Sequence, residues 1–327
     1  MGGLKLEVQA YQRTGQEKNL KELKKRSNAK KWRKIKNHWQ LYVLLILPIM
    51  YVLVFKYTPM YGILMGFKQY NPSKGILKSP WVGLKWFRMF IQSPQFARLM
   101  KNTIIISLYS LLGNMIPPII LAIAINEAKN KWFKKSVQLI TYMPHFLSVV
   151  VITSIVQQLL SNNGVLNNMI AALGEDKISF LGKPGYFAHI YVWSGVWQNM
   201  GYNAIIYIAA LAGISPELRE AAEIDGANIW QRIFHIDVPG IMPTAVIMLI
   251  LGSASVLNVG FEKIFLLQND LNMRASDVIS TYVYRIGLKN VEYSMATAIG
   301  LFQSVVSALI LCLVNQISKK VTESSLW

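Results

Sequence analysis

The chain has 327 residues, of which 53% are hydrophobic and only 15% are charged. Soluble globular domains carry about 25% charged residues, so this composition argues against a cytosolic enzyme. The single cysteine, Cys312, excludes an intrachain disulfide and a zinc site built from several thiolates. The net charge is +18, and its meaning depends on where along the chain the charge lies.

Residues 1–39 form a basic arm that we place in the cytoplasm. The first 40 residues carry twelve Lys and Arg against three Glu, which is half of the net charge of the chain. They lack the apolar core and the cleavage site of a signal peptide. Two interpretations stay open: the arm lies on an anionic leaflet, or it is a disordered positive-inside segment. Nucleic-acid binding is not expected, because no recognisable fold follows the basic run before the first apolar stretch.

Residues 40–327 contain six apolar stretches long enough to cross a bilayer as helices. None of them carries Asp, Glu, Lys or Arg deeper than Lys56. Lys and Arg are denser in the segments on the same side as the arm than in the opposite segments, which predicts both termini inside the cell. We therefore predict an all-α membrane protein with six transmembrane helices. The stretches are 40–57, 103–126, 137–160, 186–214, 238–260 and 294–317.

The sequence lacks the sites with which one chain could drive uphill transport or catalysis. It contains no G-x-x-x-x-G-K-[ST] loop for ATP, and its four histidines lie in different segments, which disfavours a zinc hydrolase. No carboxylate lies inside the six stretches, so the usual proton relay of a secondary transporter is missing. A membrane enzyme would need a cluster of acid/base or metal-binding residues, which we do not find. Uphill transport would therefore need a partner that supplies free energy.

Residues 215–239, hereafter the acidic loop, differ from an ordinary cytoplasmic loop. They hold five carboxylates and two arginines, whereas a loop that faces an anionic leaflet should be basic. We predict a short helix in which Ala221 and Ala222 let a partner surface approach the backbone. Gly226 then permits a sharp turn before a second short helix, and Pro239 opens the fifth stretch. The alternative is an amphipathic helix that only stabilises the bundle.

The acidic loop resembles the E-A-A-x3-G-x9-I-x-L-P signature of permease subunits of binding-protein-dependent ABC importers. Val238 stands where that signature has Leu, which is a conservative change. Segments such as YMPHFLS and IIYIAALAGISPELREAAEIDGAN are similar to carbohydrate permeases, closest to the subgroup for polysaccharides and complex oligosaccharides that includes alginate importers. The matching residues of the signature are Glu220, Ala221, Ala222, Gly226, Ile236 and Pro239.

The resemblance implies a type I ABC importer permease fold in the cytoplasmic (inner) membrane of a bacterium. It implies that the acidic loop is a coupling helix seated in a cleft of a cytoplasmic ATPase, with Glu220 facing a basic residue of that ATPase. The partners would be a second permease subunit, two copies of the ATPase and an extracytoplasmic solute-binding protein. This chain would hold no cofactor and hydrolyse no ATP, because the ATPase subunits bind ATP and magnesium.

Polar and aromatic residues in the fourth stretch, together with one residue of the fifth, are suited to a sugar. Aromatic rings stack on the apolar face of a sugar, and amides bond its hydroxyl groups. The alternative is that the amides bond neighbouring helices and the tryptophans mark the membrane interface. The tentative pathway residues are Trp193, Trp197, Gln198, Asn199, Asn203 and Asn258.

We therefore predict the transmembrane subunit of an ATP-driven importer for an oligosaccharide or polysaccharide. A passive channel or facilitator for a polar solute is the alternative, which would not need an acidic, alanine-faced loop. Four cations in the last outer segment could attract an acidic glycan such as alginate, or contact the binding protein, and the sequence does not choose between these roles. These cations are Lys263, Arg274, Arg285 and Lys289.

Overall fold

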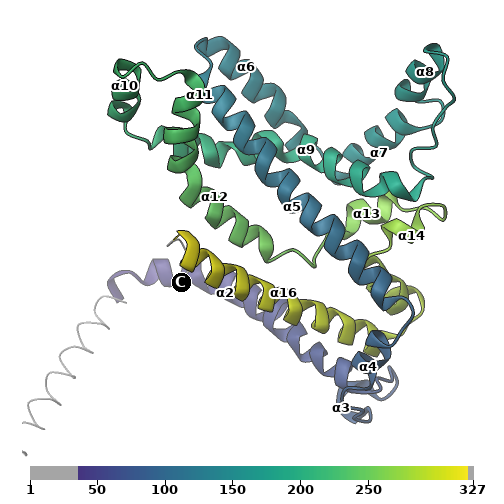
Figure 1. The fold of residues 1–327 in the computed structure, drawn as a ribbon. Helices are drawn as coiled ribbons and strands as arrows, with labels where there is room; N and C mark the ends of the chain where they lie inside the picture. Colours follow the sequence, from purple (N-terminus) through teal and green to yellow (C-terminus); the bar gives the residue numbers. More distant parts are fainter. Residues whose placement is uncertain (1–35, 323–327) are drawn as a thin grey trace, which may run out of the picture. The chain divides into compact units, whose positions relative to one another are not determined.

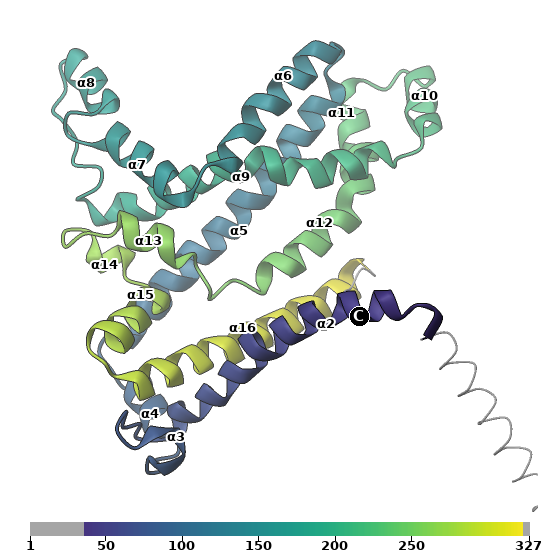
Figure 2. The same cartoon turned by 180° about the vertical axis from the view of Figure 1, so that it is seen from behind.

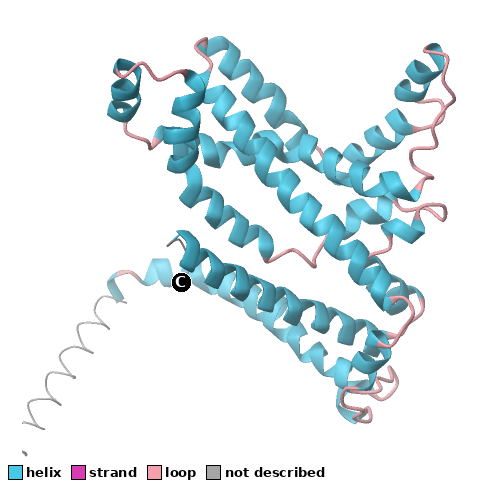
Figure 3. Ribbon diagram, viewed as in Figure 1, coloured by secondary structure: helices cyan, strands magenta, loops and turns pink. Residues whose placement is uncertain are grey.

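The computed structural model describes residues 36–322 of the chain. These residues are almost entirely helical and contain no strand, so the predicted all-α class is confirmed for them (Figure 3). The chain divides into two compact units, residues 1–62 and 63–327, which we describe separately. Most of the basic arm lies outside the described residues, so its structure and its role stay predictions.

The described part of the first unit is helical, as predicted for residues 40–57. The helix changes type just before Pro59, because proline has no N–H for the helical ladder. At this change the hydroxyl of Thr58 donates a hydrogen bond to the carbonyl of Leu53 over 3.0 Å. The last element continues into the second unit. The elements are α2 (Trp39–Val52), the π-helical turn η1 (Leu53–Tyr57) and the 3-10 helix η2 (Thr58–Phe67).

Two short helices follow η2 in the second unit, α3 (Gly75–Lys78) and α4 (Lys85–Ile91). Such a segment of short helices and turns fits the four prolines in residues 58–101. Phe90 of α4 is 1% exposed and anchors the segment in an apolar cluster with Leu99 and Ile299.

Two long helices, α5 (Phe96–Glu127) and α9 (Pro184–Ala212), pack against each other (Figures 1 and 2). Their close approach depends on Gly113, where an added Cβ would lie 2.9 Å from Val192. α5 runs through Pro117 and Pro118 without a break in its helical residues. The two helices therefore form the framework that positions both candidate sites described below.

The third predicted stretch, 137–160, is divided, which corrects its boundaries. Pro144 lies in a 3-10 turn, and the extended residues Leu147 and Ser148 separate two helices. The Ser148 hydroxyl caps the second helix by accepting a hydrogen bond from the Val151 amide at 3.3 Å, which favours a new helix start there. The elements are α6 (Lys131–Tyr142), η3 (Met143–Phe146), α7 (Val149–Leu160) and α8 (Val165–Ala172).

The fifth predicted stretch, 238–260, begins too late and ends too late. The chain is continuously helical from residue 229 to residue 253, residues 254–257 form a turn, and residues 258–260 are irregular. Proline has no N–H to donate to the helical ladder. Because the residues before Pro239 form a π-helical turn, the helix continues through this proline and does not need to start there. The elements are α10 (Pro216–Ile224), α11 (Ile229–Arg232), η4 (Ile233–Asp237) and α12 (Val238–Ser253).

The last part of the chain packs short helices against the N-terminal half of α5 and ends in a long helix. Asn102 of α5 donates hydrogen bonds to the backbone carbonyls of Arg274 and Asp277, at 3.0 and 2.9 Å. The acidic loop lies at the opposite end of α5 (Figures 1 and 2). The elements are α13 (Phe261–Leu267), α14 (Met273–Ser276), α15 (Ile279–Tyr284), η5 (Arg285–Lys289) and α16 (Tyr293–Thr322).

Five segments of the described residues are long and apolar enough to cross a membrane by length and composition. α9 has 29 residues but is not one of them, because its amide and aromatic side chains make it less apolar. The number of six spans and the placement of both termini inside the cell therefore stay predictions. The five segments are Trp39–Phe67, Phe96–Glu127, Val149–Ala172, Ile229–Ser253 and Tyr293–Lys320.

Candidate functional site

The acidic loop begins with helix α10, the short helix predicted to carry Ala221 and Ala222, which starts at Pro216. Proline is well placed there, because the first helical residue has no intrahelical partner for an N–H. The side chain of Ser215, the N-cap residue, makes no capping hydrogen bond, and its carbonyl accepts one from the Leu218 amide at 3.2 Å. Glu217 in the first turn complements the positive end of the helix dipole.

Gly226 ends α10 in the left-handed region, with φ of +78°. The Ala227 amide donates to the Ala222 carbonyl at 2.9 Å, and the Gly226 amide donates to the Glu223 carbonyl at 3.1 Å. These two bonds form a Schellman motif, in which glycine avoids the penalty that a Cβ brings at positive φ. A Cβ at residue 226 would meet no atom within 4 Å. The position therefore requires glycine for its backbone conformation and not for space.

A capping box restarts the chain as α11, directly after the turn. The Asn228 side chain accepts from the Gln231 amide at 2.9 Å, and the Gln231 side chain accepts from the Asn228 amide at 2.7 Å. This reciprocal pair satisfies two amides that would otherwise lack partners at the helix start. The Asn-x-x-Gln spacing is a usable signal in the sequence, although the predictions above do not include it. The helix that begins at this box continues through η4 into α12.

Four ion pairs form a network that joins the acidic loop to the C-terminal end of α5. The Arg219 guanidinium contacts the Glu127 carboxylate at 3.0 Å and also pairs with Asp237, which is fully buried. Arg232 lies 3.5 Å from Glu127 and also pairs with Glu223. Glu127 is not among the residues predicted from the sequence, because no local pattern links it to residues about 100 positions later. The network therefore connects α10 to η4 and to the end of α5 by ion pairs.

The remaining carboxylates and several apolar side chains of the acidic loop face outward. Glu220 and Asp225 are exposed and form no ion pair among the described residues. Ile224 is 86% exposed, and Trp230 and Phe234 stack with ring centroids 6.3 Å apart while both stay exposed. Beside them lies a depression of about 390 Å³. An apolar, acidic and concave surface of this kind is suited to a protein partner with basic residues.

The depression in the acidic loop lies between α10 and α11. The motif residues Ala222, Gly226 and Ile236 line it, and Ala221 and Pro239 are exposed beside it. Three of the six signature residues therefore share the wall of one depression. Their role in coupling stays a proposal.

Two of the predicted pathway residues bond neighbouring segments. Gln198 is 8% exposed, and its amide donates to the Leu147 carbonyl at 3.2 Å. The Asn199 side chain bonds the His145 ring at 2.9 Å and donates to the Gly195 carbonyl at 3.0 Å. Both amides therefore make bonds of the kind that the packing alternative expects, and their place in the pathway stays a prediction.

The two predicted tryptophans of α9 are partly exposed, Trp193 at 54% and Trp197 at 44%. The Trp193 indole donates to the Tyr109 hydroxyl at 2.6 Å, and that hydroxyl bonds His189 at 3.0 Å. Trp193 also lines an apolar pocket of about 390 Å³ on its own side of α9.

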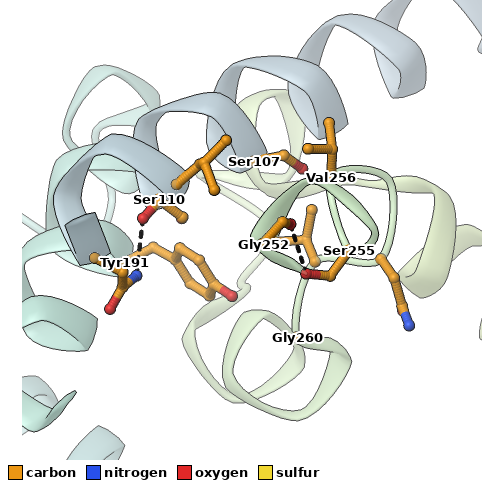
Figure 4. A pocket seen from close by; sticks show the side chains of 11 residues that line it. Ser107, Ser110, Tyr191, Gly252, Ser255, Val256 and Gly260 are labelled. Atoms are coloured by element: carbon orange, nitrogen blue, oxygen red, sulfur yellow. Dashed lines mark hydrogen bonds between the residues drawn. The ribbon is translucent and has the colours of Figure 1, made fainter. Parts of the chain in front are cut away.

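Asn258 and Asn203 line pockets that share residues with one another. Asn258 lies in the turn after α12 and lines both a pocket of about 200 Å³ and a pocket of about 460 Å³. The smaller of these, shown in Figure 4, shares Asn114 with a third pocket of about 140 Å³ that Asn203 lines. The three pockets thus form a series along polar side chains.

The pocket in Figure 4 is polar on several sides. Ser107 and Ser110 line it from α5, and their hydroxyls have no hydrogen-bond partner in the described part of the chain. Tyr191 reaches it from α9, and Ser255 lines it from the turn after α12. The two serines and Tyr191 are not among the residues predicted from the sequence. A stripe of polar residues at positions 107, 110 and 114, one helical face of an apolar stretch, was the signal available.

The four cations proposed for an acidic solute have different surroundings. Arg285 is 2.6 Å from the fully buried Asp277, and Arg274 is exposed. Lys289 lies 5.9 Å from the ring centroids of two aromatic residues. Lys263 is 8% exposed and its ammonium group has no hydrogen-bond partner. Burial lowers the pKa of Lys263 to about 8.

Residues 117–323 match the model of a family described as "Binding-protein-dependent transport system inner membrane component". Protein LplB of Bacillus subtilis (strain 168) is 40% identical over 88% of this chain and 91% of its own length. The polygalacturonan/rhamnogalacturonan transport system permease protein YteP of the same organism is 38% identical over 88% of this chain and 90% of its own length.

A solved structure is also similar over nearly all of the chain. It is a bacterial alginate ABC transporter in complex with an alginate pentasaccharide-bound periplasmic protein. The matching chain of that structure is 41% identical to this one, with a TM-score of 0.82. The match covers 90% of this chain and 99% of the other. The TM-score and the coverage show that the two chains share the arrangement of their helices.

Proposed function

We propose that this chain, which belongs to the family of binding-protein-dependent transport system inner membrane components, is the permease subunit of an ATP-driven oligosaccharide importer. The observation that carries the proposal is the likeness to a chain of an alginate transporter over 99% of its length. The name of YteP, which refers to polygalacturonan and rhamnogalacturonan, supports a glycan with acidic sugar units. The chain would not be an enzyme itself.

The free energy for transport would come from a cytoplasmic ATPase that docks on the acidic loop. Glu220 and Asp225, which form no ion pair among the described residues, would provide a surface for a basic cleft together with the exposed apolar side chains, and Glu220 would pair with a cation there. Ala221 and Ala222 would allow close approach to α10. ATP and magnesium would be bound by the ATPase, and this chain would need no cofactor. Arg219 would then carry a displacement of α10 to α5 and η4 through its ion pairs.

The complete importer would contain further subunits. A second permease subunit, two ATPase copies and an extracytoplasmic solute-binding protein would assemble with this chain in a bacterial cytoplasmic membrane. The periplasmic protein in the similar alginate transporter structure supports the last of these partners. With the predicted orientation, the acidic loop lies inside the cell together with the basic arm, where an ATPase is available.

The solute would pass along the series of three pockets, in which Asn258 joins two and Asn114 joins the third. Serine hydroxyls, asparagine amides and tyrosine rings are the groups that bind a polyhydroxylated molecule, and they line these pockets. Asn203 and Asn258 keep their proposed place in the path. We assign Gln198 and Asn199 to packing, because their amides already bond neighbouring backbone or side-chain groups.

The test is ATP hydrolysis and uptake by the reconstituted complex. Glu220→Gln is expected to reduce oligosaccharide-stimulated ATP hydrolysis at least tenfold while the permease still inserts and binds its partner permease. Glu217→Gln is the matched control, because it removes the same charge from the same exposed helix outside the signature. Uptake in vesicles that lack any ATPase would instead establish the passive channel and overturn the proposal.

A further inference from the structure

Lys263 on α13 is a buried cation without a polar partner among residues 36–322. It is 8% exposed, and its ammonium nitrogen makes no hydrogen bond to that part of the chain. The nitrogen lies 5.2 Å from the ring centroid of Tyr191, and a Cβ at Gly195 would lie 3.3 Å from it. The glycine therefore leaves room for the ammonium group against α9. A buried charge in such a place is costly unless an anion comes to it.

No carboxylate of the described residues pairs with Lys263. The neighbouring Glu262 is exposed, and Asp277, the buried carboxylate of this part of the chain, is shared by Arg285 and Arg98. A lysine with a pKa of about 8 is still mostly charged at pH 7. The described part of the chain thus presents a cation whose counter-ion must come from elsewhere.

The position of Lys263 ties it to the pocket of Figure 4. Tyr191, over whose ring the ammonium lies, is a wall of that pocket, and Gly260, three residues before Lys263, is another. The hydroxyls of Ser107 and Ser110, both without partners, line the same pocket. Ser107 is only 6% exposed. Lys263 is not itself a wall of the pocket, and Tyr191 is the residue that connects its ammonium group to these hydroxyls. Hydroxyls and an ammonium group without partners among the described residues suit a ligand that carries both hydroxyl and carboxylate groups.

We propose that Lys263 selects the charge of the transported sugar by binding the carboxylate of a uronate unit in an acidic oligosaccharide. The inference rests on the proposed importer function and names its substrate class. The flexible four-carbon stem of lysine lets the ammonium move from the Tyr191 ring toward a sugar in the pocket. Ser107 and Ser110 bond the hydroxyls of the same sugar, and Tyr191 offers its ring as a stacking surface.

The experiment compares acidic and neutral sugars of equal length in the reconstituted complex with its binding protein. The probes are tetrasaccharides of galacturonate and of mannuronate, each also as its uncharged methyl ester. The measured quantity is the ratio of uptake of the acid to uptake of the ester. Because one binding protein delivers the sugar in every arm, a change in this ratio between variants reports the membrane subunit.

We expect Lys263→Met to lower the ratio for the transported acid about tenfold or more, the fold-change expected from losing one charge-assisted bond. Lys263→Arg should keep the preference for the acid. Lys177→Met is the matched control, because it removes an exposed cation between α8 and α9 that is not one of the four cations considered for an acidic solute, and it should leave the ratio unchanged. Methionine removes the buried charge without leaving another, so the variant is expected to fold.

The outcomes distinguish a failure of the proposed role of Lys263 from a failure of the proposed importer function. An unchanged ratio in Lys263→Met, or equal uptake of acid and ester by the original protein, overturns the role of Lys263 and leaves the importer function intact. Loss of the partner permease on purification of Lys263→Met shows that the counter-ion is a carboxylate of that subunit, which also overturns it. Failure of the original complex to take up any probe with ATP present overturns the proposed function itself.

Discussion

Replacing Arg219 by Met tests whether the acidic loop is held to α5 by charge. The Arg219 guanidinium contacts Glu127 at 3.0 Å and is the only ion-pair partner of Asp237 among the described residues. Asp237 is fully buried, and one of its carboxylate oxygens already has no hydrogen-bond partner. Removal of Arg219 therefore leaves a buried carboxylate without any cation.

The expected cost follows from the burial of this carboxylate. The lost pair with Glu127 adds to this cost: the charges of Arg219 and Glu127, 3.0 Å apart, attract by about 5.5 kcal/mol at an effective dielectric constant near 20, before desolvation is counted. Removal of one partner of a buried pair typically costs about 3–5 kcal/mol. For a unit of this size that corresponds to a decrease in Tm of about 6–10 °C. The free energy of unfolding of the second unit should fall accordingly.

The assay is thermal unfolding of the purified protein in detergent, followed by tryptophan fluorescence, with hydrogen exchange of residues 215–239 as the local measurement. Lys129→Met is the control, because Lys129 is an exposed cation near the same end of α5 that forms no ion pair among the described residues. Adding Asp237→Asn to Arg219→Met should recover part of the loss, since the buried charge is then gone. A decrease of less than 2 °C for Arg219→Met, or a double variant as unstable as the sum of the two single variants, would refute the reasoning.

Three further predictions concern packing and turns, and each is checked by the same unfolding measurement. Gly201→Ala should lower the free energy of unfolding by more than about 2 kcal/mol, because the new Cβ would lie 2.3 Å from a backbone oxygen of α6. Gly185→Ala on the same helix is the control, because its Cβ would meet nothing within 4 Å and the variant should be as stable as the original protein or more stable. Gly226→Val should cost more than Gly226→Asn, since asparagine tolerates positive φ, and equal losses would contradict a conformational role. Asn167→Ala should lower the free energy of unfolding by about 2–3 kcal/mol, because the buried Asn167 amide makes three hydrogen bonds with backbone groups of residues 161–178. It should also speed hydrogen exchange in those residues, and unchanged exchange would be evidence against this role.

Local sequence predicted the helical class, the apolar helices and the form of the acidic loop. Hydropathy is a property of a continuous stretch, so it locates a helix without knowledge of its neighbours. Pro216 and Gly226 act on their own backbone, which is why the start and end of α10 were predictable. The predicted boundaries were wrong for the third and fifth stretches, because a proline removes one N–H locally but the surrounding structure decides whether the helix ends there. Near Pro144 the helix is interrupted and a second helix begins, whereas near Pro239 the helix continues with a π-helical turn.

Tertiary structure alone decided which polar groups are paired and which stay free. Glu127 meets Arg219 across 92 residues, and Gln198 donates to a carbonyl 51 residues away, so neither bond leaves a periodic signal in the sequence. Asn203 and Asn258 line linked pockets because helix packing brings their segments to the same region. Lys263 looked like any other outer cation until burial without an anion set it apart. Composition determines how much charge a chain carries, but the cost of a charge depends on the neighbours that folding provides.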